Sequence, residues 1–280
     1  MKNLLIGVFS NYDWETVKPW VVSASKLENC DKYLIVLNAD FETVENISSY
    51  GIKSIICNVD EEKKIVYNET NIVPYVERFL HLYNFLNTFA KDYKFVITTD
   101  VKDVVFQNDP FEYLENNLGD KKLICGSECL RYKDEPWGNQ NLLETFGKYI
   151  HAQFNNNEIF NVGVLGGYCE YVRDLCLNIF LGSINRPIDV VDQAVFNAFV
   201  STQPYSDCVM FSRPSDGWVI HAGTTNDPNK IQSFEKKLLE EPAKFIDGVV
   251  MNSDNKPFYI VHQYDRNPEW KDFFVKKYSE

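Results

Sequence analysis

The sequence predicts an α/β fold in which helices cover both faces of a mostly parallel central sheet. One observation is that unbroken apolar runs of strand length alternate with segments of helical length through the first hundred residues. Such alternation is typical of strand–helix–strand units, which build parallel sheets. A second is that 45% of the 280 residues are hydrophobic, which supplies a sizeable core.

The first half of the chain alternates strands and helices in a regular order. Apolar strands are expected at 4–9, 32–37, 52–59 and 95–97, and helices at 16–27, 41–50 and 74–90. The helix over 74–90 is the clearest, because its apolar residues recur at helical spacing. This order places Asp100 and Asp103 just beyond an inner strand, at the edge where open α/β sheets bind ligands.

The second half is less regular. Strands are expected at 121–126, 160–167, 217–221 and 258–262, and helices at 170–180 and 190–201. Residues 131–141 (RYKDEPWGNQN) are polar and rich in turn-forming residues, so we expect a loop there. Because no repeat or low-complexity linker divides the sequence, it is expected to form a single domain over 1–280.

Charge and cysteine content narrow the class of protein. The net charge is −12 and no basic stripe is present, which argues against nucleic acid as a partner. A phosphorylated ligand would need local cations, and a bound divalent metal is one way to supply them. Seven cysteines without a CxxC pair predict free thiols in a reducing compartment. No apolar run reaches membrane-spanning length, so we expect no membrane span and a cytoplasmic location.

Residues 95–111 (FVITTDVKDVVFQNDPF) carry the first candidate site. Asp100 and Asp103 follow a buried strand, and carboxylate oxygens on a turn suit Mg²⁺ or Mn²⁺, which can bridge a diphosphate. The alternative is a turn in which the two aspartates bind only the local backbone.

Two segments further along the chain carry candidates for ligand contact and proton transfer. Glycines around the strand at 159–167 allow a ligand to approach closely at Asn161 and Gly163, although they also fit ordinary strand packing. Asp192 opens a helix and can serve as a general base. A carboxylate in the first turn also stabilises a helix by itself, so both interpretations of Asp192 stay open.

The last candidate segment contains His262 and Arg266. His262 leaves a late strand, where its imidazole can complete a metal site begun by carboxylates. Arg266 can hold a phosphate through its planar guanidinium group. His221 follows another apolar strand and is the rival metal ligand, but His262 is favoured.

The string from Asp100 to Phe111 resembles the DxD-type region of GT-A glycosyltransferases, in the variant D-x-[RK]-D-V-x-F-Q-x-[DN]-P-F. This resemblance implies a GT-A (Rossmann-like) fold with a smaller acceptor-side C-terminal part, in which 1–115 is the nucleotide-binding half and 116–280 the acceptor-binding half. It implies a metal and donor site at Asp100 and Asp103, with Asp103 the stronger metal ligand and Lys102 near the phosphates or the donor sugar. The spacing is DxxD rather than DxD, so which carboxylate contacts the metal stays open.

Other segments resemble parts of the same family. Those that resemble its metal and donor-sugar contacts are Asn161 and Gly163 in an N-x-G-x-x-x-G segment, Asp192 in a DQ helix start, His262 as a late metal ligand and Arg78 as a donor-binding arginine. Those that resemble its uracil and ribose contacts are Ser10, Asn11, Tyr12 and Asp40. Glu128 or Glu135 are substitutes for Asp192 as the base, and Trp137 and Trp218 offer aromatic faces for an acceptor sugar.

Together these resemblances imply a glycosyltransferase that uses Mn²⁺ or Mg²⁺. It would move a sugar from a nucleoside-diphosphate sugar to a hydroxyl of an oligosaccharide or glycoprotein glycan, with inversion. The chain most resembles small soluble enzymes of chlorella viruses that build capsid glycans. That implies a UDP-sugar donor and the host cytoplasm as the location, and a xylosyltransferase using UDP-xylose is a plausible member.

Three alternatives are weighed against this interpretation. The first is a retaining enzyme of the same fold, and the second is an inactive protein that only binds nucleotide sugars or carbohydrates. The third, a nucleotidyltransferase, would need a loop rich in glycine, lysine and arginine after the first strand, where this chain has Ser10-Asn11-Tyr12-Asp13.

Overall fold

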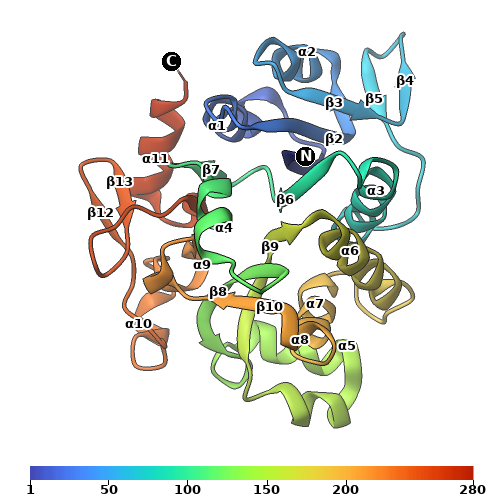
Figure 1. Cartoon of the computed structure of the whole chain (residues 1–280). Helices are drawn as coiled ribbons and strands as arrows, with labels where there is room; N and C mark the ends of the chain where they lie inside the picture. Colours follow the sequence, from blue (N-terminus) through green and yellow to red (C-terminus); the bar gives the residue numbers. More distant parts are fainter. Residues whose placement is uncertain (280) are drawn as a thin grey trace.

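A large mixed sheet organises the computed structural model, which describes residues 1–279 (Figure 1). Its nine strands are β1 (Lys2–Ser10), β2 (Cys30–Asp40), β3 (Lys53–Ile56), β4 (Asn58–Asp60), β5 (Ile65–Tyr67), β6 (Tyr93–Thr99), β8 (Leu123–Arg131), β9 (Glu158–Tyr168) and β10 (Val209–Ser212). They follow the order β10-β8-β9-β6-β1-β2-β5-β4, and β3 also pairs with β2. The predicted α/β class is confirmed.

Parallel and antiparallel pairs of strands both occur in this sheet. β1 runs parallel to β2 and β6, and β2 runs parallel to β3, as the alternation of strands and helices predicts. β9 is antiparallel to both of its neighbours, β6 and β8. Each half also holds the other kind of pair, because β5 is antiparallel to β2 and β4, and β10 runs parallel to β8. The sheet is therefore mixed, and the prediction that it is mostly parallel is wrong.

Eleven α-helices surround the sheets in the described part of the chain. They are α1 (Trp14–Ser25), α2 (Phe41–Ser49), α3 (Pro74–Phe89), α4 (Pro110–Asn117), α5 (Pro136–Phe154), α6 (Cys169–Ser183), α7 (Asp192–Val200), α8 (Tyr205–Cys208), α9 (Ala222–Thr225), α10 (Ile231–Phe234) and α11 (Pro268–Lys277). Short 3-10 helices are η1 (Tyr132–Asp134), η2 (Pro214–Asp216) and η3 (Tyr264–Arg266). Within residues 1–279, no helix is both long and apolar enough to cross a membrane.

Both faces of the large sheet are covered, which explains why its inner strands are apolar without alternation. Along β1, Leu5 faces a core formed with α1, α2 and α4, whereas Leu4 and Ile6 face a second core formed with α3, α6 and α7. On this second face, α3 and α6 lie side by side (Figure 1).

The prediction of a loop at 131–141 is wrong, because the chain forms η1 there and then begins α5. Pro136 occupies the first turn of α5, and the Glu135 carboxylate accepts a hydrogen bond from the backbone N–H of Gly138. A proline at the first helical position after a capping acid is a helix-start signal. In this segment it outweighs the turn-forming residues that follow.

A second, three-stranded sheet has the order β11-β14-β7 and consists of β7 (Val104–Phe106), β11 (Val219–His221) and β14 (Ile260–His262). A hairpin of β12 (Lys244–Ile246) and β13 (Val249–Met251) lies between β11 and β14 in the chain. In the small sheet, His262 is paired in register with His221 on one side and with Val104 on the other. This pairing brings the end of β14 beside the segment that follows β6.

The cysteines are free thiols, as predicted. All seven lie within residues 1–279, and none forms a disulfide there.

Candidate functional site

Two carboxylates and one imidazole meet where β6 and β14 end and β7 begins. Asp100 directly follows β6, Asp103 precedes β7, and His262 is the last residue of β14. Nε2 of His262 lies 3.4 Å from Oδ2 of Asp100 and 3.5 Å from Oδ1 of Asp103. One potential ligand atom from each residue lies within 4.8 Å of the other two. We call these three residues the DDH triad.

The DDH triad fits a divalent cation in charge and in space. Nε2 of His262 is buried and has no hydrogen-bond partner among the described residues. A Cβ on Gly163 would lie 2.5 Å from Cε1 of His262 and 2.7 Å from Oδ2 of Asp100, so only glycine leaves this space open. Two carboxylates and a neutral imidazole form a mixed oxygen and nitrogen ligand set that suits Mn²⁺ and also accommodates Mg²⁺.

The DDH triad is also strongly coupled electrostatically. Burial opposes the charged form of His262, but Asp103 and Asp100 outweigh this effect and raise its pKa to about 9. Burial likewise opposes ionisation of Asp100, but Arg78 and His262 hold the pKa of that carboxyl well below its usual range. A cation held by the carboxylates would therefore compete with a proton on His262.

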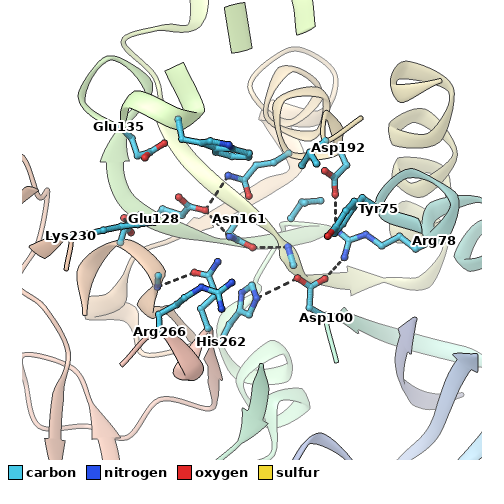
Figure 2. Close-up of a pocket in the computed structure, with 18 residues that line it drawn as sticks. Tyr75, Arg78, Asp100, Glu128, Glu135, Asn161, Asp192, Lys230, His262 and Arg266 are labelled. Carbon is cyan, nitrogen blue, oxygen red and sulfur yellow. Dashed lines mark hydrogen bonds and ion pairs between the residues drawn. The ribbon is translucent and has the colours of Figure 1, made fainter. Parts of the chain in front are cut away.

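Arg78 joins the DDH triad to a third carboxylate (Figure 2). From α3 it donates hydrogen bonds to Asp100 through Nη1 and to Asp192 through Nη2, the latter at 2.8 Å. Burial lowers the pKa of Arg78, but the two carboxylates more than compensate and hold it above its usual range. Burial raises the pKa of Asp192 in spite of Arg78. Asp192 begins α7, but no side chain caps that helix.

A hydrogen-bonded chain runs from Asp100 to Glu128, and Figure 2 shows its last link, from Asn161 to Glu128. The backbone N–H of Asp100 donates to the carbonyl of Gly163 at 2.7 Å, and the N–H of Gly163 donates to Oδ1 of Asn161 at 2.7 Å. Nδ2 of Asn161 then donates to Oε1 of Glu128 at 2.6 Å, and Nε2 of Gln193 donates to the same oxygen at 3.1 Å. Burial raises the pKa of Glu128, and these two amides only partly offset it.

Two cavities meet at the DDH triad. The β1-side cavity, of about 460 Å³, lies beside the loop that follows β1. The β8-side cavity, of about 250 Å³, lies beside Glu128 of β8. Both cavities are lined by Tyr75, Arg78, Asp100 and Arg266. A molecule that fills the β1-side cavity can therefore present one end to the β8-side cavity.

Most of the residues predicted for the site line one or both cavities. The β1-side cavity contains Ser10, Asn11, Tyr12, Arg78, Asp100, Lys102, Asp103 and Arg266. The β8-side cavity contains Arg78, Asp100, Glu128, Glu135, Trp137, Asn161, Gly163, Asp192, His262 and Arg266. Residues from the whole length of the chain thus converge on one region.

Besides Arg78, the side chains of Lys102 and Arg266 bring positive charge to the β1-side cavity. Nζ of Lys102 lies 3.3 Å from Asp265, and Nη2 of Arg266 lies 3.8 Å from Asp103.

Asp40 lies outside both cavities. Its carboxylate caps α2 by accepting from the N–H of Thr43 at 2.7 Å, and it faces an adjoining hollow that Asn11 and Tyr12 also line.

Several candidates have other positions than expected. Trp218 is 0% exposed in the core, so it offers no face to an acceptor, whereas Trp137 is 54% exposed at the β8-side cavity. The Glu135 carboxylate is used to cap α5. His221 lies outside the DDH triad, behind His262, and burial lowers its pKa well below the usual range.

Several residues that line the cavities were missed as site candidates in the sequence, among them Tyr75, Gln193 and Lys230. Tyr75 lies on α3 three positions before Arg78, and Gln193 follows Asp192 on α7. Tyr75 could have been found from Arg78, because residues three apart share a helix face. Gln193 could have been found only as the chain neighbour of Asp192. Lys230 also lines the β8-side cavity, and no sequence pattern marks it.

Comparisons with known proteins match the fold. By sequence, no family profile and no curated protein matches the chain. By structure, it is similar to the apo structure of the bifunctional glycosyltransferase WbbM, with a TM-score of 0.61 and 13% identity over 99% of this chain and 49% of that one. It is also similar to the glycosyltransferase GlyE of Streptococcus pneumoniae TIGR4, with a TM-score of 0.50 and 14% identity over 99% of this chain and 61% of GlyE. The chain therefore has a glycosyltransferase fold and spans about half the length of WbbM and three fifths of GlyE.

Proposed function

We propose that the chain is a metal-dependent glycosyltransferase of the GT-A type. The observation that carries this proposal is the DDH triad at the junction of two cavities, within a glycosyltransferase fold. Transfer from a nucleotide sugar needs a site for the nucleotide, a site for the acceptor and a common point where the sugar is exchanged. The paired cavities supply this arrangement.

The β1-side cavity is the proposed donor site. Ser10, Asn11 and Tyr12 offer polar groups and an aromatic ring to a base and ribose, and Lys102 and Arg266 offer cations to a diphosphate. Asp100, Asp103 and His262 would hold Mn²⁺ or Mg²⁺, which would act as a Lewis acid on the diphosphate leaving group. A UDP-sugar is the proposed donor, and UDP-xylose is the first to test.

The β8-side cavity is the proposed acceptor site. Trp137 presents an exposed indole at its edge, and aromatic faces pack well against sugar rings. Inversion requires a carboxylate that takes the proton of the acceptor hydroxyl. Asp192 was the first choice, but Arg78 already neutralises it. Glu128 accepts only neutral amide hydrogen bonds, so we propose Glu128 as the base and Asp192 as a residue that orients the donor sugar with Arg78.

Replacing Glu128 with glutamine should lower the rate of transfer by about a hundredfold, at the low end of what a general base contributes. The variant should be at least as stable as the parent at pH 7. The reason is that a carboxyl whose pKa is raised by folding binds its proton more tightly when folded, so the parent gains stability as the pH falls through that raised pKa. Urea unfolding at pH 7 and pH 5 measures this gain in stability at the lower pH, and the glutamine variant should lack it. The matched control is the exposed Glu45→Gln, and full transfer by Glu128→Gln would remove Glu128 as the base.

A thermal-shift experiment tests the proposed function as a whole. The melting temperature is measured with Mn²⁺, with UDP or GDP, and with each pair of metal and nucleotide. Metal and UDP together should stabilise the fold more than either alone, because a ligand that binds only the folded state raises its stability. If no combination of metal and nucleoside diphosphate shifts the melting temperature, the proposal fails. The anomeric configuration of the product, read by NMR, then separates inversion from retention.

A further inference from the structure

We infer that His221 is a positioning residue that holds the ring of His262 with Nε2 turned toward the two carboxylates. The inference rests on the proposed metal-binding role of the DDH triad and concerns how the ring of His262 is held in the orientation that metal binding needs. His221 itself contacts neither carboxylate, and its proposed partner is the opposite nitrogen of His262.

The geometry of the two histidines is set by the small sheet. β11 and β14 are parallel, and His221 and His262 are paired in register as the last residues of these strands. Nδ1 of His221 lies 2.9 Å from Nδ1 of His262, and the two rings are inclined at 84°. Both side chains are buried. A contact of this length between two ring nitrogens requires one proton between them.

The position of that proton follows from the role of Nε2. To bind a metal, Nε2 of His262 must carry a lone pair, so the proton of the neutral ring lies on Nδ1. Nδ1–H of His262 then donates to Nδ1 of His221. His221 has no carboxylate within hydrogen-bonding distance among residues 1–279, so it is neutral and keeps its own proton on Nε2.

The surroundings of His221 support a role beyond core packing. Its Nε2 is buried and has no hydrogen-bond partner among the residues that the structure describes. Gly126 leaves room for it, because a Cβ there would lie 2.5 Å from this nitrogen. A buried N–H without a partner is unfavourable, and an apolar side chain would fill the position at lower cost. Metal-binding histidines commonly have their second nitrogen fixed by a neighbouring group, and this accounts for a histidine here.

Two variants of similar shape separate positioning from packing. In His221→Asn, Oδ1 takes approximately the place of Nδ1 and can still accept the hydrogen bond, whereas His221→Leu fills the same space without an acceptor. We expect His221→Leu to bind Mn²⁺ about 10- to 100-fold more weakly than the parent, the usual effect of losing such a partner. His221→Asn should retain most of the affinity. Mn²⁺ binding is measured by electron paramagnetic resonance of the free ion, with and without UDP.

The order of the two variants in stability, measured by urea unfolding, should be the opposite of their order in Mn²⁺ affinity. Leucine buries no polar group and should be at least as stable as the parent, whereas asparagine buries amide groups and should be less stable. If His221 only packs the core, metal affinity will follow stability, and His221→Leu will bind Mn²⁺ as tightly as the parent. That result overturns the inference and leaves the proposed function standing. If the parent binds no Mn²⁺ with or without UDP, the proposed function fails first.

Nitrogen NMR of the Mg²⁺-loaded parent gives a direct readout. The ¹⁵N shifts of the ring nitrogens, assigned with the His221→Asn variant, should place the shared proton on Nδ1 of His262. A proton bound to Nδ1 of His221 would leave His262 with the wrong tautomer for metal binding, and would overturn the inference.

Discussion

Replacing Asp103 with asparagine should lower metal-dependent transfer by at least about a thousandfold, which corresponds to the several kcal/mol that a bound metal contributes to such reactions. Asp103 is buried within the DDH triad, and its Oδ1 lies 3.5 Å from Nε2 of His262. An amide of the same shape removes one anionic ligand and leaves the packing nearly unchanged. The measurement is the initial rate of transfer from a UDP-sugar at increasing Mn²⁺.

The same variant should lose the rise in melting temperature that Mn²⁺ gives with UDP. A matched control is Asp120→Asn, which makes the same chemical change at an exposed turn and should leave both readouts intact. If Asp103→Asn still responds to Mn²⁺ as the parent does, Asp103 is not a ligand, and the metal site must be placed elsewhere.

Replacing Arg78 with methionine should reduce both stability and activity. Arg78 is shared between Asp100 and Asp192, so the variant leaves two carboxylates close together without their cation. We expect the free energy of unfolding to fall by about 3 kcal/mol, the lower end of the cost of breaking a buried ion pair. Transfer should fall by about a hundredfold or more, because the groups around the donor sugar lose their alignment. Urea unfolding and initial rates measure the two effects.

Controls for Arg78 can separate charge from packing. In Arg78→Met combined with Asp192→Asn, stability should recover in part because one of the two carboxylates is gone, while transfer stays low. Arg78→Lys should not restore activity, since one ammonium cannot donate in the same fork to both partners. Arg173→Met removes a surface pair with Asp174 and should cost less than about 1 kcal/mol. An unchanged stability of Arg78→Met would contradict the bridging role.

The sequence predicts the core of the site better than its edges. Asp100 and Asp103 could be placed at a sheet edge because the strand before them is an unbroken apolar run, and parallel strands bring their carboxyl ends together. His262 was found because it ends another apolar run. The bridge from Arg78 to Asp192 was not predictable, since it joins positions 114 apart and depends on where α3 and α7 pack.

The fold of the second half is the less predictable part for a physical reason. The apolar run predicts a strand at 160–167 but carries no information on its direction, and the observed strand β9 is antiparallel to both neighbours. Trp218 reads equally well as an exposed platform or as a core residue, because burial depends on tertiary packing. Glu135 and Pro136 indicate the start of α5, but the turn-forming residues that follow them in the chain favour a loop.

The position of β14 has a consequence for the order in which the protein would assemble the proposed metal site. β14 is the central strand of the small sheet, between β11 and β7, and it supplies the histidine that the two aspartates need. The aspartates are synthesised early and His262 late, with most of the second half between them. Closing so long a loop is slow and comes late in folding. If the DDH triad binds a metal as proposed, tight binding would require that β14 has joined its sheet, and the metal would then report completed folding.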